Sequence, residues 1–291
     1  MTRIETFLGL EPEECRYDDA RVVLLPVPYD GTTCYRPGAR FGPDAIVDAS
    51  CHVELWDVEL GREPWEVGIH LASGVEPSAS GPEVVVGQVE QACSGLLRDD
   101  KRPFVLGGEH TVTLGALRAL CALGDAGPTS MLQVDAHLDL RDSYEGSPYS
   151  HACVARRVLD LGVGVVHVGV RTACPEELEV IRRHELRPLW AHELRRSGDW
   201  IQQALEQLTS RVYVSVDVDG LDPSIMPGTG TPVPGGLGWY ELLELLKAVG
   251  EQREIVGCDL VELAPTPGQN ASEFTAAQLA YKMIGYFWPT Q

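Results

Sequence analysis

The chain has 291 residues, of which 44% are hydrophobic and 23% are charged, a composition typical of a folded protein with a substantial core. Acidic residues outnumber basic residues by 43 to 23, and the net charge of −20 argues against binding to nucleic acid or to an anionic membrane, because both need a basic face. A negative field suits a small cationic substrate, although the same charge would also serve solubility alone.

The N-terminus carries no recognisable export signal. Residues 1–12 contain neither a basic cluster nor an apolar run of the kind found in signal peptides, and no apolar run reaches the roughly 18 residues of a membrane span. The eight cysteines are spread over the chain and form no CxxC pair. We therefore expect a cytoplasmic protein with reduced thiols.

Short apolar runs alternate with amphipathic segments along the chain. The runs, which are typical of strands buried in a parallel sheet, are residues 22–27, 104–106, 131–134, 165–170, 212–216 and 255–260. The segments with helical spacing are residues 84–97, 114–123, 200–208, 239–249 and 274–287. Loops rich in Gly, Pro, Asp and Ser are expected at residues 28–43, 141–150 and 219–238. This alternation predicts a doubly wound α/β fold, and we expect one domain over residues 1–291.

Polar motifs follow three of the predicted strands at their carboxyl ends, where ligands bind in open α/β sheets. The motifs are Gly107-Gly108-Glu109-His110, Asp135-Ala136-His137-Leu138-Asp139 and Asp217-Val218-Asp219-Gly220. If the second motif stays extended, its three polar side chains lie on one side of the chain. Imidazole and carboxylate groups without cysteine point to manganese, iron or zinc, and they argue against a structural zinc site.

The three motifs supply six candidate metal ligands: His110, Asp135, His137, Asp139, Asp217 and Asp219. Four crowded carboxylates are unfavourable unless they are protonated or bind cations. Two divalent ions balance four negative charges, and two-metal hydrolytic centres hold their ions about 3.5–4 Å apart. Each motif alone would also fit a capped turn or a core histidine. The three together predict a binuclear metal site.

These motifs, completed by residues 215–223, resemble those of the ureohydrolases: arginase, agmatinase, formiminoglutamase and the guanidino-acid hydrolases. The resemblance covers nearly the whole chain. It implies a three-layer α/β/α arginase-type fold with a mostly parallel sheet of about eight strands. It also implies two Mn²⁺ ions per subunit, a small cationic guanidino substrate and a homo-oligomer, either a trimer or a hexamer.

The resemblance further implies how the ligands divide between the two ions. Asp135 and Asp217 bridge both ions, His110 and Asp139 hold one of them, and His137 and Asp219 hold the other. A hydroxide shared by the ions would then attack the guanidinium carbon, because metal coordination lowers the pKa of bound water toward neutrality.

Two further residues match family positions. His151 follows the loop at residues 141–150 and matches a histidine thought to carry protons to the leaving amine, although by itself it would be read as a surface histidine. Glu262 matches the glutamate that binds the guanidinium, and its alternative is a solvated residue at a strand end. With Asp139, these two residues form the catalytic set that the resemblance implies.

The loops indicate which ureohydrolase this is. Residues 27–43 and 144–154 are most like agmatinase, and the Asn-x-His-Gly loop usual in arginases is absent. We therefore predict hydrolysis of agmatine to putrescine and urea, a step of polyamine synthesis. A guanidinobutyrase or another guanidino-acid hydrolase shares every ligand and stays open. Arg171 does not separate these readings, and we expect it to form a structural salt bridge. A non-catalytic metal-binding relative is the alternative from a different class.

Overall fold

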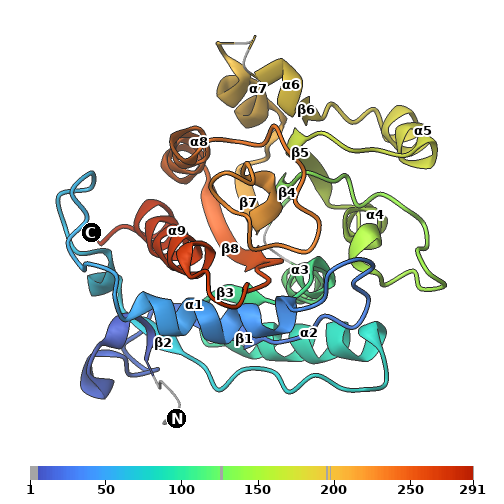
Figure 1. Ribbon diagram of the computed structural model, residues 1–291. Helices are drawn as coiled ribbons and strands as arrows, with labels where there is room; N and C mark the ends of the chain where they lie inside the picture. The colour runs from blue at the N-terminus through green and yellow to red at the C-terminus, as the bar shows by residue number, and fades with distance from the viewer. Residues whose placement is uncertain (1–5, 125–126, 195, 197, 291) are drawn as a thin grey trace.

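A computed structural model describes residues 6–124, 127–194, 196 and 198–290, and within them eight strands form one sheet (Figure 1). The strands are β1 (Val22–Val27), β2 (Ile69–Leu71), β3 (Arg102–Gly107), β4 (Thr129–Val134), β5 (Gly164–Val170), β6 (Leu189–Trp190), β7 (Arg211–Asp217) and β8 (Glu254–Val261). Their order is β2-β1-β3-β8-β7-β4-β5-β6, and every neighbouring pair is parallel. The predicted α/β fold with a mostly parallel sheet of about eight strands is confirmed.

Six of the strands contain the six apolar runs that predicted them. The other two, β2 and β6, have three and two residues and lie at the two edges of the sheet. Strands this short cannot carry a recognisable period-two or continuous apolar pattern. Edge strands are also commonly kept short because an exposed edge invites pairing with other chains.

Helices connect the strands. They are α1 (Gly42–Ser50), α2 (Pro82–Arg98), α3 (Thr113–Ala122), α4 (Val154–Asp160), α5 (Pro175–His184), α6 (Ala191–Leu194), α7 (Trp200–Gln207), α8 (Trp239–Gln252) and α9 (Ala271–Phe287). Short 3₁₀ helices are η1 (Phe7–Gly9), η2 (Pro12–Glu14), η3 (Ala39–Phe41), η4 (Pro64–Val67), η5 (His110–Val112), η6 (His151–Cys153) and η7 (Val218–Gly220).

Five of these helices, α2, α3, α7, α8 and α9, agree with the predicted segments to within three residues. Helices α1, α4, α5 and α6 carry no prediction, and α1 begins at Gly42, inside the segment expected to be a loop. Pro43 and Pro175 lie in the first two positions of α1 and α5, where the fixed φ of proline favours a helix start. Pro43, which lies in the segment predicted to be a loop, therefore marks a helix start instead.

The helices cover both faces of the sheet (Figure 1). Helices α1, α8 and α9 lie on one side, and α2, α3 and α4 lie on the other, with α1 packed on α9 and α2 packed on α3. Successive residues of a strand enter opposite cores: Phe104 packs with the α1–α9 side and Val105 with the α2–α3 side. Both faces of the central strands are therefore buried, which explains their continuous apolar runs.

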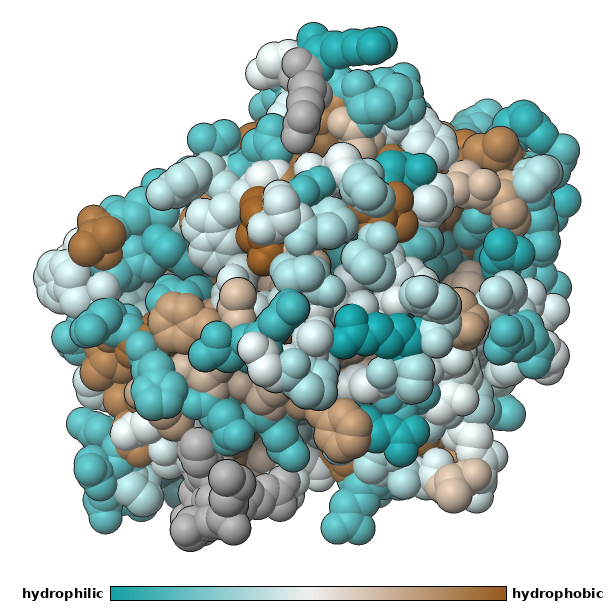
Figure 2. Space-filling model, viewed as in Figure 1, coloured by the Kyte–Doolittle hydropathy of each residue, from teal (hydrophilic) through white to brown (hydrophobic). Residues whose placement is uncertain are grey.

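The surface contrasts with these cores. The face seen in Figure 2 is mostly hydrophilic, and its hydrophobic residues lie in small separate groups. Strand residues such as Leu106 and Val214 are fully buried. Among the residues that the structure describes, none of the helices combines the length and the hydrophobicity needed to cross a membrane.

Candidate metal centre and active site

The six predicted ligands meet at the carboxyl edge of neighbouring strands. His110 begins η5 after a two-residue turn that follows β3, residues 135–139 follow β4, and β7 ends at Asp217, with Asp219 in η7. Strand β8, which lies between β3 and β7, ends one residue before Glu262. The parallel order β3-β8-β7-β4 therefore brings residues that are far apart in the sequence into one group.

We call this group the inner cluster, and it consists of His110, Asp135, His137, Asp139, Asp217 and Asp219. His110 Nδ1 lies 3.1 Å from both Asp135 Oδ2 and Asp139 Oδ2, and 3.5 Å from Asp217 Oδ2. His137 Nδ1 lies 3.1 Å from Asp219 Oδ2 and 3.4 Å from Asp135 Oδ1. Asp135 thus faces both imidazoles, with one oxygen toward each.

Two groups of ligand atoms within the described residues are compact enough to hold one ion each. One group combines His110, Asp135 and Asp217, and the other combines Asp135, His137 and Asp219. Asp135 belongs to both groups, as expected of a bridging ligand. Asp217, also predicted to bridge, belongs only to the first group, and Asp139 reaches the cluster through His110.

The hydrogen bonds of His110 test whether a cation fits here. Ser215 Oγ donates to Asp259 Oδ1 at 2.7 Å, so its oxygen accepts from His110 Nε2, 2.8 Å away. When the ring is neutral, as a metal ligand must be, its proton is then on Nε2, and buried Nδ1 turns a lone pair toward three carboxylates. Within the described part of the chain, Nδ1 has no hydrogen-bond partner. A lone pair that faces carboxylates is unfavourable unless a cation lies between them, so the donor set fits a metal ion.

The electrostatics of the cluster lead to the same conclusion. Burial opposes charge on both imidazoles, yet the neighbouring carboxylates raise the pKa of His137 to about 12 and that of His110 well above its usual range. Burial, together with Asp219 and Asp135, raises the pKa of Asp217 well above its ordinary value. The cluster therefore lacks positive charge, and divalent cations would supply it.

Glu262 lies beside the cluster in a strained backbone conformation. Its φ is 66°, and that of Asp139 is 52°, values in the left-handed region that are uncommon for residues other than glycine. Glu262 N–H donates to Gly108 O at 2.7 Å, and Glu262 Oε1 accepts from His110 N–H at 2.7 Å. Burial, followed by repulsion from Glu109, raises the pKa of the Glu262 carboxyl. The bonds to Gly108 and His110 hold this carboxylate at the metal centre.

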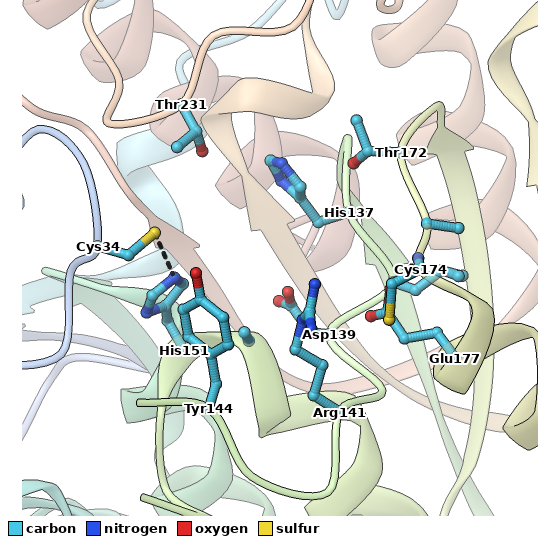
Figure 3. Close-up of a pocket in the computed structure, with 13 residues that line it drawn as sticks. Cys34, His137, Asp139, Arg141, Tyr144, His151, Thr172, Cys174, Glu177 and Thr231 are labelled. Atoms are coloured by element: carbon cyan, nitrogen blue, oxygen red, sulfur yellow. Dashed lines mark hydrogen bonds between the residues drawn. The ribbon is translucent and has the colours of Figure 1, made fainter. Parts of the chain in front are cut away.

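Two cavities with overlapping linings lie at the cluster. The inner cavity has a volume of about 30 Å³, and its lining includes His110, Asp217, Asp219 and Glu262. The outer cavity has a volume of about 260 Å³ and is shown in Figure 3. The residues shared by both linings are Cys34, His137, Asp139, His151 and Thr231. A ligand can therefore extend from the inner cavity past His151 into the outer one.

His151 lies where the two cavities meet. Its Nδ1 is 3.2 Å from Thr32 Oγ1, and its Nε2 is 3.7 Å from the thiol sulfur of Cys34 (Figure 3). Burial, together with His137 and His110, lowers the pKa of His151 to about 4, so the ring is neutral near pH 7. It is a cavity residue rather than a surface histidine.

Several cavity residues carry no prediction from the sequence. The Arg141 guanidinium lies 4.9 Å from the centre of the Tyr144 ring, and that ring contacts His151 edge-on. The buried Glu177 carboxylate accepts from the backbone N–H of Cys174 at 2.8 Å. The order Cys-Pro-Glu-Glu at residues 174–177 could have indicated a helix start with a capping glutamate. Nothing in that order indicates that it faces a cavity.

Arg171 has a structural part. Its guanidinium donates to the carbonyl oxygens of Val233 at 2.8 Å and Gly169 at 2.9 Å, and it also donates to the carbonyl of Asp219. These carbonyls take the place of the salt bridge expected from the sequence. Arg171 is not among the residues that line either cavity, so it ties the segment after β7 to β5.

Comparison with known proteins shows which family this chain resembles. A sequence model of the arginase family matches residues 20–285. The chain belongs to the arginase family. A relative named N(1)-aminopropylagmatine ureohydrolase, from Synechocystis sp., is 42% identical over 281 residues, which cover 94% of this chain and 92% of the relative. An agmatinase from Pyrococcus horikoshii is 37% identical over 270 residues, with 92% of each chain covered.

A solved structure agrees with the fold of this arginase-family protein. The agmatine ureohydrolase of Thermoplasma volcanium superposes with a TM-score of 0.85 at 33% identity, covering 94% of this chain and 91% of that one. The predicted arginase-type fold is therefore confirmed. The protein is a ureohydrolase of the agmatinase type, a hydrolase that acts on carbon–nitrogen bonds of linear amidines. Both relatives carry the names of hydrolases, which favours an enzyme over the predicted alternative of a non-catalytic relative.

Proposed function

We propose that this ureohydrolase removes urea from N1-aminopropylagmatine, with agmatine as the second candidate substrate. The observation that carries the proposal is the pair of adjoining cavities: a small inner one lined by Glu262 and cluster residues, and an outer one of about 260 Å³. The guanidinium fits the inner cavity, and the alkyl chain with its distal amines fits the outer cavity. The name of the 42% identical relative favours the longer substrate, and the 37% identical agmatinase favours the shorter one.

We propose that two Mn²⁺ ions per subunit occupy the inner cluster. The imidazole and carboxylate ligands suit manganese, and the two ligand groups share Asp135. The predicted bridging part of Asp217 and the pairing of Asp139 with His110 belong to this proposal. When bound, the ions would polarise water and make a nucleophile available near neutral pH.

The chain's own residues orient the substrate and move the proton. Glu262 Oε1 is engaged by His110 N–H, so Oε2 accepts an N–H of the guanidinium and holds its carbon over the cluster. His151 Nε2 accepts the proton released when water adds to that carbon and passes it to the alkyl nitrogen. The bond between carbon and alkyl nitrogen then breaks. Urea leaves together with spermidine, or with putrescine if the substrate is agmatine.

A guanidino acid is the alternative that one observation favours. Arg141 lines the outer cavity and would attract a distal carboxylate. Its guanidinium, however, lies over the Tyr144 ring, and the buried carboxylate of Glu177 lines the same cavity. A cationic distal end agrees better with that carboxylate and with the net charge of −20. The trimeric or hexameric assembly and the cytoplasmic location stay predictions.

The test is urea release by manganese-loaded protein from N1-aminopropylagmatine, agmatine, 4-guanidinobutyrate and arginine, compared by kcat/KM. We expect the two polyamines to exceed the two acids by at least about 100-fold, roughly 2.7 kcal/mol. We also expect N1-aminopropylagmatine to exceed agmatine. A preference for 4-guanidinobutyrate would overturn the proposed substrate class, and Arg141 would then be the expected partner of the distal carboxylate.

A further inference from the structure

We propose that Thr32 and Glu109 are positioning residues that set the tautomer of His151, with its proton on Nδ1 and a bare Nε2 facing the cavities. The inference rests on the proposed function, because it explains how His151 is prepared to accept a proton. It concerns two side chains from the loop before α1 and from the turn before η5, neither of which contacts the substrate in the proposed reaction.

A close backbone approach brings Thr32 and Glu109 together. Glu109 N–H donates to Tyr29 O at 2.7 Å, and Gly108 N–H donates to Val27 O at 2.8 Å. A Cβ on Gly108 would collide with the carbonyl oxygen of Tyr29, so glycine is required for the two segments to run this close. Glu109 is fully buried by this contact, and its carboxylate meets Thr32.

The hydrogen bonds of Thr32 direct its hydroxyl proton to the carboxylate of Glu109. Thr32 N–H donates to Glu109 Oε2 at 2.7 Å, and Thr32 Oγ1–H donates to Glu109 Oε1 at 2.7 Å. Burial raises the pKa of Glu109 to about 7, and the two bonds from Thr32 oppose that rise. In its ionised form the carboxylate can only accept, so both Thr32 donors are then committed to it. The two lone pairs of Oγ1 remain, and they can only accept.

Both lone pairs of Thr32 Oγ1 face His151. The His151 backbone N–H donates to Oγ1 at 3.1 Å, and Nδ1 lies 3.2 Å from the same oxygen. Because Oγ1 has no free proton to give, Nδ1 must carry the proton of this contact. Ser150 Oγ lies farther from Nδ1, at 3.4 Å, and can accept a share of the same proton.

The other side of the ring is consistent with a bare Nε2. A neutral imidazole carries one proton, so a proton on Nδ1 leaves Nε2 as an acceptor. Cys34 Sγ lies 3.7 Å from Nε2, where its thiol can donate a weak bond (Figure 3). Nε2 is therefore held in the state that accepts a proton during the reaction.

A second chain of imidazole, hydroxyl and carboxylate occurs in this protein. His110, Ser215 and Asp259 form a chain of imidazole, hydroxyl and carboxylate that puts the proton on Nε2 and leaves Nδ1 for a metal ion. His151, Thr32 and Glu109 form the mirror arrangement, with the proton on the opposite nitrogen. In each case a buried carboxylate fixes a hydroxyl, and the hydroxyl fixes the ring.

The tautomer can be measured without any activity. Long-range ¹H–¹⁵N correlation spectra of the full-length, metal-free protein distinguish the two histidine tautomers, and the His151→Asn variant assigns the signal. We expect the Nδ1–H form in the wild-type protein and in Thr32→Ser. In Glu109→Gln the amide oxygen must face Thr32 N–H, so its NH₂ faces Oγ1, and the freed hydroxyl proton turns to Nδ1. The ring should then change to the Nε2–H form.

An Nε2–H form in the wild-type protein would overturn the proposal, as would an unchanged tautomer in Glu109→Gln. Kinetics give the second test: Thr32→Val and Glu109→Gln should lower kcat about 100-fold with KM within about threefold, and Thr32→Ser should recover most of the loss. An unchanged kcat in Glu109→Gln with a changed tautomer would also overturn the positioning role. If the wild-type protein releases no urea from any guanidino compound, the proposed function fails, and the spectra still decide the tautomer separately.

Discussion

The inner cluster and the outer cavity differ in the parts of the fold from which their side chains come. The inner cluster is attached to the ends of β3, β4 and β7, and all its members except His137 are buried. The outer cavity is lined largely by loops and helix starts, with Arg141 and Tyr144 in one loop and Cys174 before α5. The difference indicates that the sheet fixes the chemistry and that the loops choose the substrate.

The two regions also differ in charge. The inner cluster holds four aspartates that need cations, whereas the lining of the outer cavity adds one arginine and one buried glutamate along the proposed path of the alkyl chain. Changes in the first region should therefore abolish every activity, and changes in the second should alter the preference between substrates.

Removal of the shared ligand should have the largest effect. Asp135→Asn takes a carboxylate from both ligand groups, so we expect urea release from every substrate to fall by more than about 1000-fold, roughly 4 kcal/mol. Manganese should also stop raising the melting temperature. The matched control is Asp142→Asn, an exposed aspartate that pairs with Arg157, and it should keep both properties. Normal manganese stabilisation of Asp135→Asn would contradict the proposed centre.

Loss of the guanidinium contact should have the next largest effect. Glu262→Gln keeps an oxygen for His110 N–H but removes the charge that faces the substrate, so kcat/KM should fall by about 100-fold to 1000-fold for all guanidino substrates. Manganese binding, measured by calorimetry, should change little because Glu262 belongs to neither ligand group. A loss of metal affinity equal to the loss of activity would make Glu262 a ligand instead.

The inner region is also the part that the sequence predicts well. Continuous apolar runs locate six strands, and the polar motifs at their ends include every member of the inner cluster, because a parallel sheet brings its carboxyl ends to one edge. The sequence does not predict the contribution of Thr32, because its contact with Glu109 spans 77 residues and depends on a close backbone approach at Gly108. The orientation of Arg141 and Tyr144 is not predicted either, because loop residues follow no regular period from which the direction of a side chain could be inferred.

Alkylation at the junction of the cavities should give a moderate effect. Cys34 is an exposed thiol that lines both cavities beside His151. Iodoacetamide should therefore lower urea release at least about tenfold by blocking the path to the inner cavity, and a bound substrate should slow the reaction. Cys34→Ser should resist this inactivation, whereas Cys121→Ser, which alters an exposed thiol on α3, should remain sensitive. If both variants resisted iodoacetamide equally, the claim that Cys34 lies on the route to the inner cavity would be contradicted.

The smallest effect should be on substrate preference. Arg141→Met removes a positive charge from the outer cavity, so kcat/KM for N1-aminopropylagmatine should rise about threefold to tenfold relative to that for 4-guanidinobutyrate. The control is Arg118→Met, because Arg118 lies over Tyr149 in a similar stack and lines neither cavity. A fall in this ratio, or an equal rise in Arg118→Met, would contradict the claim that the charge of Arg141 acts on the distal end of the substrate.

The central claim is that the inner cluster is a binuclear metal centre that releases urea. The most direct measurement is urea release from N1-aminopropylagmatine by chelator-treated protein as manganese is added back, with bound metal counted by elemental analysis. The account predicts no activity without metal and a plateau at two ions per subunit. Full activity without metal, or no urea from any of the four substrates at two ions per subunit, would contradict it.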